Sequence, residues 1–274
     1  MSIDIWGAVR ARSNAAHASG ALYRIESEPF FVEDGGVEFV VRRAIDWERQ
    51  LRTQPKGKPG NPFVDPEPEL IVVDRLGDKH RAMLNKYHVV EDHVLVVTRE
   101  FEVQEVLLDR ADFESLVACL PPNGRAIGFY NGGRDSGASQ PHKHMQVVSL
   151  PLSPHLPIPM APKLVPDPPA LPFPFAFARV DHLDPPRLHR TYRELLGKAG
   201  VGTVLAGGVE RQSKSYNMLL GPGWMLVVPR VRDRFEGVPI NSIAFAGAFF
   251  VRNDTELEAV RALGPFSILD HVCN

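Results

Sequence analysis

The part of the sequence richest in reactive groups is the run His-Lys-His-Met-Gln-Val-Val at residues 142–148. Side chains alternate between the two faces of a β-strand, so His142, His144 and Gln146 are expected on one face. Directly upstream, the small residues 137–140 (Gly-Ala-Ser-Gln) allow backbone N–H groups to approach an anion closely. A neutral imidazole, with an ordinary pKa of about 6.5, can attack phosphorus without first losing a proton. The run therefore predicts a nucleophilic histidine beside a phosphate-binding loop.

Two other interpretations of the histidine pair are open. A His-x-His pair on a strand can bind zinc or another transition metal, but no third ligand lies nearby in the sequence and glutamine is a poor partner for zinc. Histidines that only satisfy structural hydrogen bonds are the usual finding for an isolated pair. The glycine-rich approach weakens that interpretation here. We therefore favour the nucleophilic role and expect no metal held by protein side chains.

The run 142–148 matches the histidine-triad signature His-x-His-x-(His or Gln)-hydrophobic-hydrophobic in its glutamine-bearing transferase form. Further matches surround it at residues 84–87, 95–101, 130–131 and 137–144. Together these residues resemble the ATP adenylyltransferase family, the diadenosine 5′,5‴-P1,P4-tetraphosphate phosphorylases, within the histidine-triad superfamily. Looser matches follow at residues 216–217, 224–230 and 241–247. The resemblance spans the chain from the loop around Lys56 onward.

The resemblance implies roles for individual residues. The family's covalent nucleophile falls on His144, with Gln146 in the third position of the motif and His142 in the first. The implied substrate contacts are Lys56, Asn85, Lys86, Asn131, Gly137, Ala138, Ser139, Gln140, Asn241 and Arg252. Arg252 stands at a family lysine position, which keeps the charge but alters its geometry. Lys58 is two residues from Lys56, and the sequence does not separate the two.

The implied activity is the reversible phosphorolysis of diadenosine tetraphosphate to ATP and ADP. His144 would attack an α-phosphorus, expel the remaining polyphosphate and form an adenylyl-histidine, from which inorganic phosphate takes the adenylyl group. A divalent cation, Mg²⁺ bound through the substrate phosphates, would share the charge. Because Gln146 does not titrate, we hypothesise that it orients phosphate oxygens without offering a base that activates water.

Other functions on the same residues stay open. These are ADP-forming sulfate adenylylation, phosphorolysis of the triphosphate homologue, and nucleotide sensing without turnover.

Composition narrows the classes of partner. The 274 residues carry 31 basic and 33 acidic side chains, a formal net charge of −2, so the positive field that nucleic-acid binding usually needs is missing. Cys119 and Cys273 form neither a disulfide framework nor a zinc spacing, which fits a reducing compartment. The longest apolar run, residues 243–251, is shorter than the roughly 20 residues of a membrane span. We expect a cytoplasmic protein that binds a dinucleoside polyphosphate and phosphate, without nucleic acid or membrane.

Apolar patterning predicts the elements that position these residues. Strands are expected at residues 70–73, 81–84, 93–98, 125–130, 142–150, 216–220 and 224–229. Helices are expected at residues 109–120, from 184 to about 197, and at 253–263. Ten prolines fall between Pro151 and Pro174, a segment too short of backbone donors to join a sheet or continue a helix.

The resemblance and this pattern predict an α+β fold of the histidine-triad kind. We expect two related halves with antiparallel sheets around one nucleotide cleft. Residues 1–152 would form the half with the motif, 153–178 an extended proline-rich connector, and 179–274 the half that completes the nucleotide site.

Residues 81–99 and 215–230 echo each other, since both place a short strand, a turn and an apolar strand that ends in arginine. Two convergent hairpins and a degenerate internal duplication both explain this echo. If the duplication is real, one chain supplies what simpler relatives make by pairing two, so we expect a monomer. Structural or solvated roles are expected for His80, His88, His93 and His155, and burial for Cys119, Trp224 and Phe245.

Overall fold

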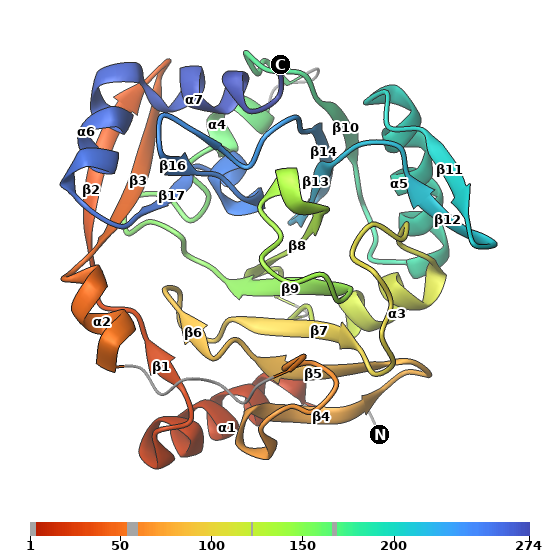
Figure 1. Cartoon of the computed structure of the whole chain (residues 1–274). Helices are drawn as coiled ribbons and strands as arrows, with labels where there is room; N and C mark the ends of the chain where they lie inside the picture. Colours follow the sequence, from red (N-terminus) through yellow and green to blue (C-terminus); the bar gives the residue numbers. More distant parts are fainter. Residues whose placement is uncertain (1–3, 54–59, 122, 166–168) are drawn as a thin grey trace.

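One antiparallel sheet of eight strands forms the centre of the structure and draws strands from both halves of the chain (Figure 1). The structure is a computed structural model that describes residues 4–53, 60–121, 123–165 and 169–274. In spatial order the strands are β10 (Ala176–Arg179), β14 (Trp224–Pro229), β13 (Tyr216–Gly221), β8 (Ala126–Gly132), β9 (His144–Ser149), β7 (Val94–Thr98), β5 (His80–Leu84) and β4 (Ile71–Leu76). The predicted α+β class with antiparallel sheets is confirmed, and every strand predicted from the sequence lies in this sheet. The two halves join within it, because β8 pairs with β13.

Both faces of the six inner strands are buried, which explains why these strands read as continuous apolar runs, whereas the edge strands β4 and β10 are partly exposed. On β13, Met218 belongs to the core on one face and Leu219 to the core on the other. The first core includes residues of α1 (Ile5–Ser19), α3 (Arg110–Ala118) and α5 (Pro185–Lys198). The second core lies against a small sheet and two helices: β17 (Ala248–Val251), β3 (Val37–Ala44), β2 (Ser27–Asp34), α6 (Asp254–Leu263) and α7 (Pro265–His271).

Shorter elements complete the described chain. They are β1 (Tyr23–Arg24), α2 (Trp47–Thr53), η1 (Pro68–Leu70), β6 (Tyr87–His88), η2 (Arg134–Ser136), α4 (Ala161–Leu164), β11 (Thr203–Ala206), β12 (Val209–Gln212), β15 (Arg234–Phe235), β16 (Val238–Pro239) and η3 (Ser242–Ala246). No helix in these described ranges is long and apolar enough to cross a membrane.

Helix starts follow the polar residues that the sequence placed there. Asp109 accepts a hydrogen bond from the backbone N–H of Asp112, and the Asp112 carboxylate accepts one from the N–H of Asp109, which forms a capping box on α3. Asp184 caps α5 ahead of two prolines, and Asn253 caps α6. These side chains satisfy N–H groups that no helical carbonyl can reach, so the predicted helix starts are confirmed.

The proline-rich segment is more than an extended connector. Its apolar side chains fill the second core, including Leu152, Met160 and Phe173. The prediction that it cannot continue a helix was wrong at one place, because residues 161–164 form the one-turn helix α4. This is possible because the residues between the prolines keep their N–H groups. No described residue between Pro151 and Pro174 lies in a strand, and β10 begins soon after the last proline and pairs with β14 at the sheet edge.

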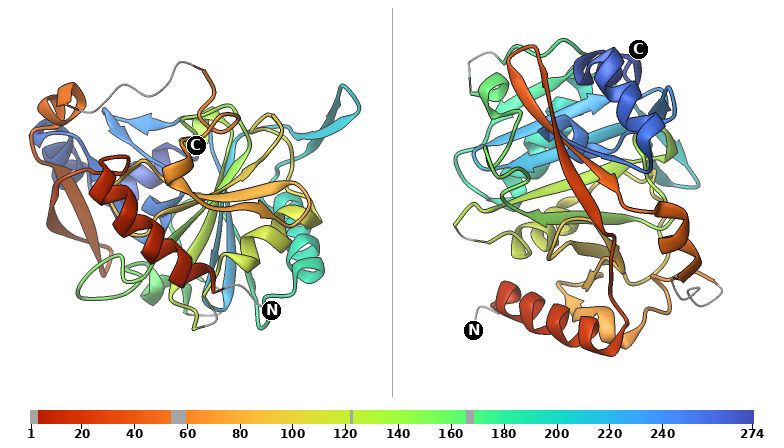
Figure 2. Two further views of the ribbon diagram at one scale, coloured as in Figure 1. Left: turned by 90° about the horizontal axis from the view of Figure 1, so that it is seen from below. Right: turned by 90° about the vertical axis from the view of Figure 1, so that its left-hand side faces the viewer.

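The sequence did not predict the β2–β3 hairpin or α7. The hairpin is held by the other end of the chain, since β17 pairs with β3 in parallel. The right-hand view of Figure 2 shows this hairpin in front, with α6 and α7 beside it and α1 at the foot of the molecule. Its burial depends on residues 200 positions away, which no local pattern records. The two echoing segments form the β5–β7 and β13–β14 pairs on either side of β8 and β9, a placement that both explanations of the echo allow.

The residues expected to be buried without a catalytic role are in the core. Trp224, Phe245 and Cys119 are all buried, and both cysteines are free thiols. Burial raises the pKa of Cys119 and of Cys273 to about 12, so neither is a thiolate at neutral pH.

Candidate active site

The site lies where β8 ends and β9 begins. These strands are antiparallel neighbours, so the last residues of one and the first of the other meet at the same edge of the sheet. Their ladder stops at the pair Phe129 and Gln146. Beyond it, the Gln104 side chain lies between the strands and bonds to both: it accepts from His144 N at 2.9 Å and donates to Asn131 O at 2.8 Å. Gln104 thus takes the place of ladder bonds between β8 and β9 beyond the pair Phe129 and Gln146.

His144 is held in one tautomer. Its Nδ1 lies 2.8 Å from the carbonyl oxygen of His142, and a carbonyl can only accept, so Nδ1 carries the proton. The other nitrogen, Nε2, makes no hydrogen bond to any described residue and is not enclosed. Burial lowers the pKa of His144 to about 4, so the ring is neutral at pH 7. The lone pair for attack is therefore on Nε2.

His142 supports this arrangement with both its backbone and its ring. Its Nε2–H donates to Thr98 O at 2.8 Å, and its Nδ1 accepts from Asn61 Nδ2 at 2.9 Å. The Phe63 ring lies 5.6 Å from the His142 ring and 5.2 Å from the His144 ring, between centroids. His142 and His144 therefore face the same side, as the alternation predicted.

Asn61 and Phe63 were not singled out by the sequence analysis. The only signal was their place in the proline- and glycine-rich loop that follows Lys56. Lys56 and Lys58 themselves lie outside the described residues.

Gln146 is bonded to a histidine that the sequence analysis treated as structural or solvated. His93 Nε2 lies 2.8 Å from Gln146 Oε1, and His93 Nδ1 lies 3.1 Å from Asn85 Nδ2. The expected substrate contact Asn85 thus touches the motif through His93. His93 sits next to Gln146 because Leu95, two residues on along β7, pairs with Gln146 in the ladder.

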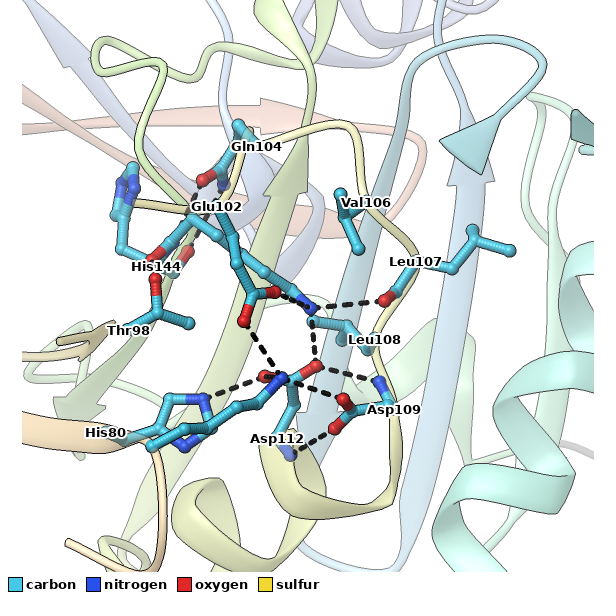
Figure 3. A network of polar contacts seen from close by, with 12 residues as sticks. His80, Thr98, Glu102, Gln104, Val106, Leu107, Leu108, Asp109, Asp112 and His144 are labelled. Atoms are coloured by element: carbon cyan, nitrogen blue, oxygen red, sulfur yellow. Dashed lines mark hydrogen bonds and ion pairs between the residues drawn. The ribbon is translucent and has the colours of Figure 1, made fainter. Parts of the chain in front are cut away.

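The back of the motif strand is fixed by a buried ionic network (Figure 3). Lys143 is 1% exposed, and its Nζ donates to Asp112 Oδ2 at 2.6 Å and to Leu107 O at 3.1 Å. Asp112 also accepts from His80 Nε2 at 2.8 Å. Burial alone would raise the pKa of Asp112, but the His80 hydrogen bond and the charges of Lys143 and Lys79 hold it well below its usual range. Lys143 therefore ties β9 to α3, on the opposite face from His144.

The second half of the chain contacts Asn131 through a cluster of polar side chains. Asn131 Oδ1 accepts from Asn217 Nδ2 at 2.9 Å and from Ser242 Oγ at 2.7 Å. Buried Arg230 bonds in turn to Asn217. The side-chain oxygen of Asn131 is therefore occupied by protein donors, and the role of Asn131 as a substrate contact stays a prediction.

The glycine-rich loop packs directly against the second half. A Cβ on Gly137 would lie 2.7 Å from Ile240 O and 3.0 Å from Asn241 Cβ, and its φ is +89°, so only glycine fits. Two backbone N–H groups of the loop are hydrogen-bonded within the loop: Gly137 N donates to Arg134 O, and Ala138 N donates to Gly133 O. The backbone donors that remain, within the described chain, are those of Ser139 and Gln140.

Two predicted cations are engaged elsewhere. Lys86 Nζ lies 2.5 Å from Glu67 Oε1, and Arg252 Nε lies 2.7 Å from Glu256 Oε1. No interaction among the described residues joins either one to the cluster around His144. Their role as substrate contacts stays a prediction.

The central sheet and the tautomer-fixed histidine of a His-x-His-x-Gln strand define a nucleotidyltransferase site of the histidine-triad class. Comparisons with known proteins agree. The family model for the Ap4A phosphorylase N-terminal domain matches residues 2–166, and the model for the ATP adenylyltransferase C-terminal domain matches residues 169–274. The chain belongs to this family, the ATP adenylyltransferases or Ap4A phosphorylases.

Individual relatives cover most of the chain. Diadenosine 5′,5‴-P1,P4-tetraphosphate phosphorylase 2 of Saccharomyces cerevisiae is 32% identical over 238 residues, which are 73% of this chain and 71% of the relative. The crystal structure of yeast Ap4A phosphorylase Apa2 matches with a TM-score of 0.80 at 24% identity and covers 99% of this chain and 97% of that one. Its complex with AMP matches with a TM-score of 0.78 at 26% identity and the same coverage.

The buried neutral imidazoles predict an acid-sensitive fold. Burial holds the pKa of His93 and of His144 at about 4, below the value of about 6.5 in an unfolded chain. Between these values the unfolded state binds more protons, so the free energy of unfolding falls as the pH falls. Each group contributes up to about 1.4 kcal/mol per pH unit. Urea titrations from about pH 7 to 5.5 measure this slope, and His144→Asn should reduce it. An unchanged slope in that variant would contradict the assignment.

The ionic network predicts an asymmetry between single and double substitutions. Asp112→Ala removes the closest counter-ion of the buried Lys143 ammonium and leaves only the Glu102 carboxylate, 3.4 Å from its Nζ, so we expect a loss of about 3 kcal/mol of unfolding free energy. The double variant Asp112→Leu/Lys143→Met buries no charge and should lose less. Urea unfolding of both variants tests this, and an equal or larger loss in the double variant is the opposing result.

Proposed function

We propose that this chain catalyses the reversible phosphorolysis of diadenosine tetraphosphate to ATP and ADP through an adenylyl group on His144. The observation that carries the proposal is the hydrogen bond from His144 Nδ1 to His142 O, which leaves an unprotonated Nε2 with no hydrogen-bond partner among the described residues. The family membership supplies the reaction class, and yeast Apa2 has been crystallised with Ap4A and with AMP.

In the first step, the Nε2 lone pair attacks the α-phosphorus of one adenylyl group. The bond between this phosphorus and its bridging oxygen breaks, and ATP leaves. The imidazole then carries a positive charge, which the His142 carbonyl stabilises through the Nδ1–H. In the second step, an oxygen of inorganic phosphate attacks the same phosphorus, the P–N bond breaks, and ADP and neutral His144 result.

The protein's main task in this reaction is to hold negative charge in line. We expect donors to the phosphates from three places: the Asn131 amide, the backbone of Ser139 and Gln140, and the Gln146 amide. Gly137 lets the loop approach residue 241, which brings Asn241 to the same edge. Such preoriented donors stabilise the developing charge without reorganising during the step.

A divalent cation such as Mg²⁺, bound through the substrate phosphates, would neutralise part of the charge of the departing polyphosphate. The acidic side chains behind the motif do not offer a vacant ligand set, because Glu102, Asp109 and Asp112 are all paired with Lys79. No group of three His, Cys, Asp or Glu side chains in the described ranges is placed to hold a metal ion. These paired carboxylates fit a cation that enters with its substrate.

We propose that the enzyme acts as a monomer in the cytoplasm.

The covalent step is tested by intact mass. After mixing with diadenosine tetraphosphate without phosphate, the chain should gain the mass of one adenylyl group, and added phosphate should discharge it as ADP. His144→Ala should show no adduct and lose about 10⁴-fold or more in kcat. His182→Ala, which removes an exposed histidine, is the matched control and should keep both.

The same assay separates the alternatives. ATP and ADP as products support the proposal, whereas sulfate accepted faster than phosphate indicates a sulfate adenylyltransferase. A preference for the triphosphate homologue indicates the shorter substrate. Nucleotide binding with no products indicates a sensor. An unmodified rate in His144→Ala would refute the covalent mechanism.

The cation is tested by chelation. With EDTA in excess, phosphorolysis should fall by about 100-fold or more and recover on addition of Mg²⁺, because the charge on the leaving polyphosphate is no longer neutralised. Equilibrium dialysis should find Mg²⁺ on the protein only when dinucleotide is present. A full rate in EDTA, or tight Mg²⁺ binding by the free chain, would contradict the proposal.

A further inference from the structure

We propose that His93 is a positioning residue that decides which end of the Gln146 carboxamide meets the substrate. The inference rests on the proposed function for the meaning of that contact, but not for the contact itself. Asn85, His93 and Gln146 form a line of hydrogen bonds that leads from the turn after β5, through the residue before β7, into the motif strand β9.

The hydrogen bonds along this line all run in one direction, from donor to acceptor. A neutral imidazole offers one donor and one acceptor. Asn85 Nδ2 faces His93 Nδ1 at 3.1 Å, so Nδ1 accepts and the ring proton is on Nε2. His93 Nε2–H then donates to Gln146 Oε1 at 2.8 Å. With its oxygen occupied, Gln146 turns its NH₂ group away from His93.

The backbone holds both ends of this line in place. Asn85 and His93 face each other across the β5–β7 hairpin, and Asn85 N donates to His93 O at 2.8 Å. The His93 ring is partly buried and lies 6.0 Å from the Phe129 ring, between centroids. A protonated His93 would carry two donors and would oppose Asn85 Nδ2, and burial, which lowers its pKa to about 4, prevents this at neutral pH.

The freed NH₂ group is on the side where the proposed chemistry takes place. Gln146 and His144 are two residues apart on one strand and share a face. Gln146 is 9% exposed, and its Nε2 neither bonds to a described residue nor is enclosed. In this orientation Gln146 meets a phosphate with two donors, whereas the flipped amide would set an oxygen against an anion. His93 thus determines whether the Gln146 carboxamide presents hydrogen-bond donors or an acceptor oxygen beside the nucleophile.

The polarity is read directly by NMR of the ring nitrogens, with or without bound AMP. We expect His93 to carry its proton on Nε2 in both states, with no protonation down to about pH 5. A proton on Nδ1 means that the whole line runs the other way, which would overturn the proposal. This readout needs no turnover, so it stands even if the chain makes no ATP and ADP.

A double-mutant cycle separates positioning from packing. If His93 acts through Gln146, then His93→Leu and Gln146→Ala should each lower kcat/KM by about 100-fold, mainly in kcat, as the loss of one transition-state donor does. The double variant should be no worse than Gln146→Ala. His93→Gln, which keeps a donor, should recover part of the loss.

The control is His182→Leu, outside this hairpin. His182 is exposed, and no described contact joins it to Asn85, His93 or Gln146. This variant should stay within about threefold of the wild type. Losses that multiply in the double variant, or a His93→Leu enzyme within threefold of the wild type, would overturn the proposal. If His93→Leu does not fold, His93→Gln and the NMR assignment decide the question. If the wild type does not turn over, AMP affinity replaces kcat/KM in the cycle.

Discussion

The proposed chemistry depends on one short hydrogen bond between neighbours in sequence, from His144 Nδ1–H to the backbone oxygen of His142. This bond settles the tautomer, and the tautomer settles which nitrogen can be a nucleophile. It also offers the carbonyl dipole to the cation that would form when phosphorus is attached. The bond is available only if the backbone of residues 142–144 is rigid, and much of the surrounding structure serves that end.

Three separate contacts hold this backbone. The His142 ring is clamped between Thr98 and Asn61, Gln104 bonds the backbone N–H and C=O of His144, and Lys143 anchors the reverse face to Asp112. Because side chains alternate along the strand, the two faces carry different groups. The face with His144 and Gln146 is left with open polar atoms, while the face with Lys143 is fully paired. The ionic network of Figure 3 therefore acts as a support for the site, not as part of its reactive surface.

The two halves of the chain cannot be assigned separate roles in this site. Asn131 comes from the first half, and its carbonyl is fixed by Asn217 and Ser242 from the second. Gly137 of the first half touches residue 241 of the second. The family models meet within the proline-rich segment, yet the sheet crosses that boundary without a break. A shared sheet suits a reaction in which donors from both halves must converge on one phosphorus.

The sequence by itself determined the local features: the strand that carries His144 and Gln146, the helix starts at Asp109 and Asp184, and the shared face of the motif. These follow from alternation, capping and apolar spacing, which act over a few residues. The tertiary structure alone decided that Asn61 holds His142, that His93 holds Gln146, and that Lys86 is paired with Glu67. These partners lie 81, 53 and 19 residues apart in the chain and meet only when the chain folds. A residue's type shows which hydrogen bonds it can make, but only the folded chain determines which of them it does make.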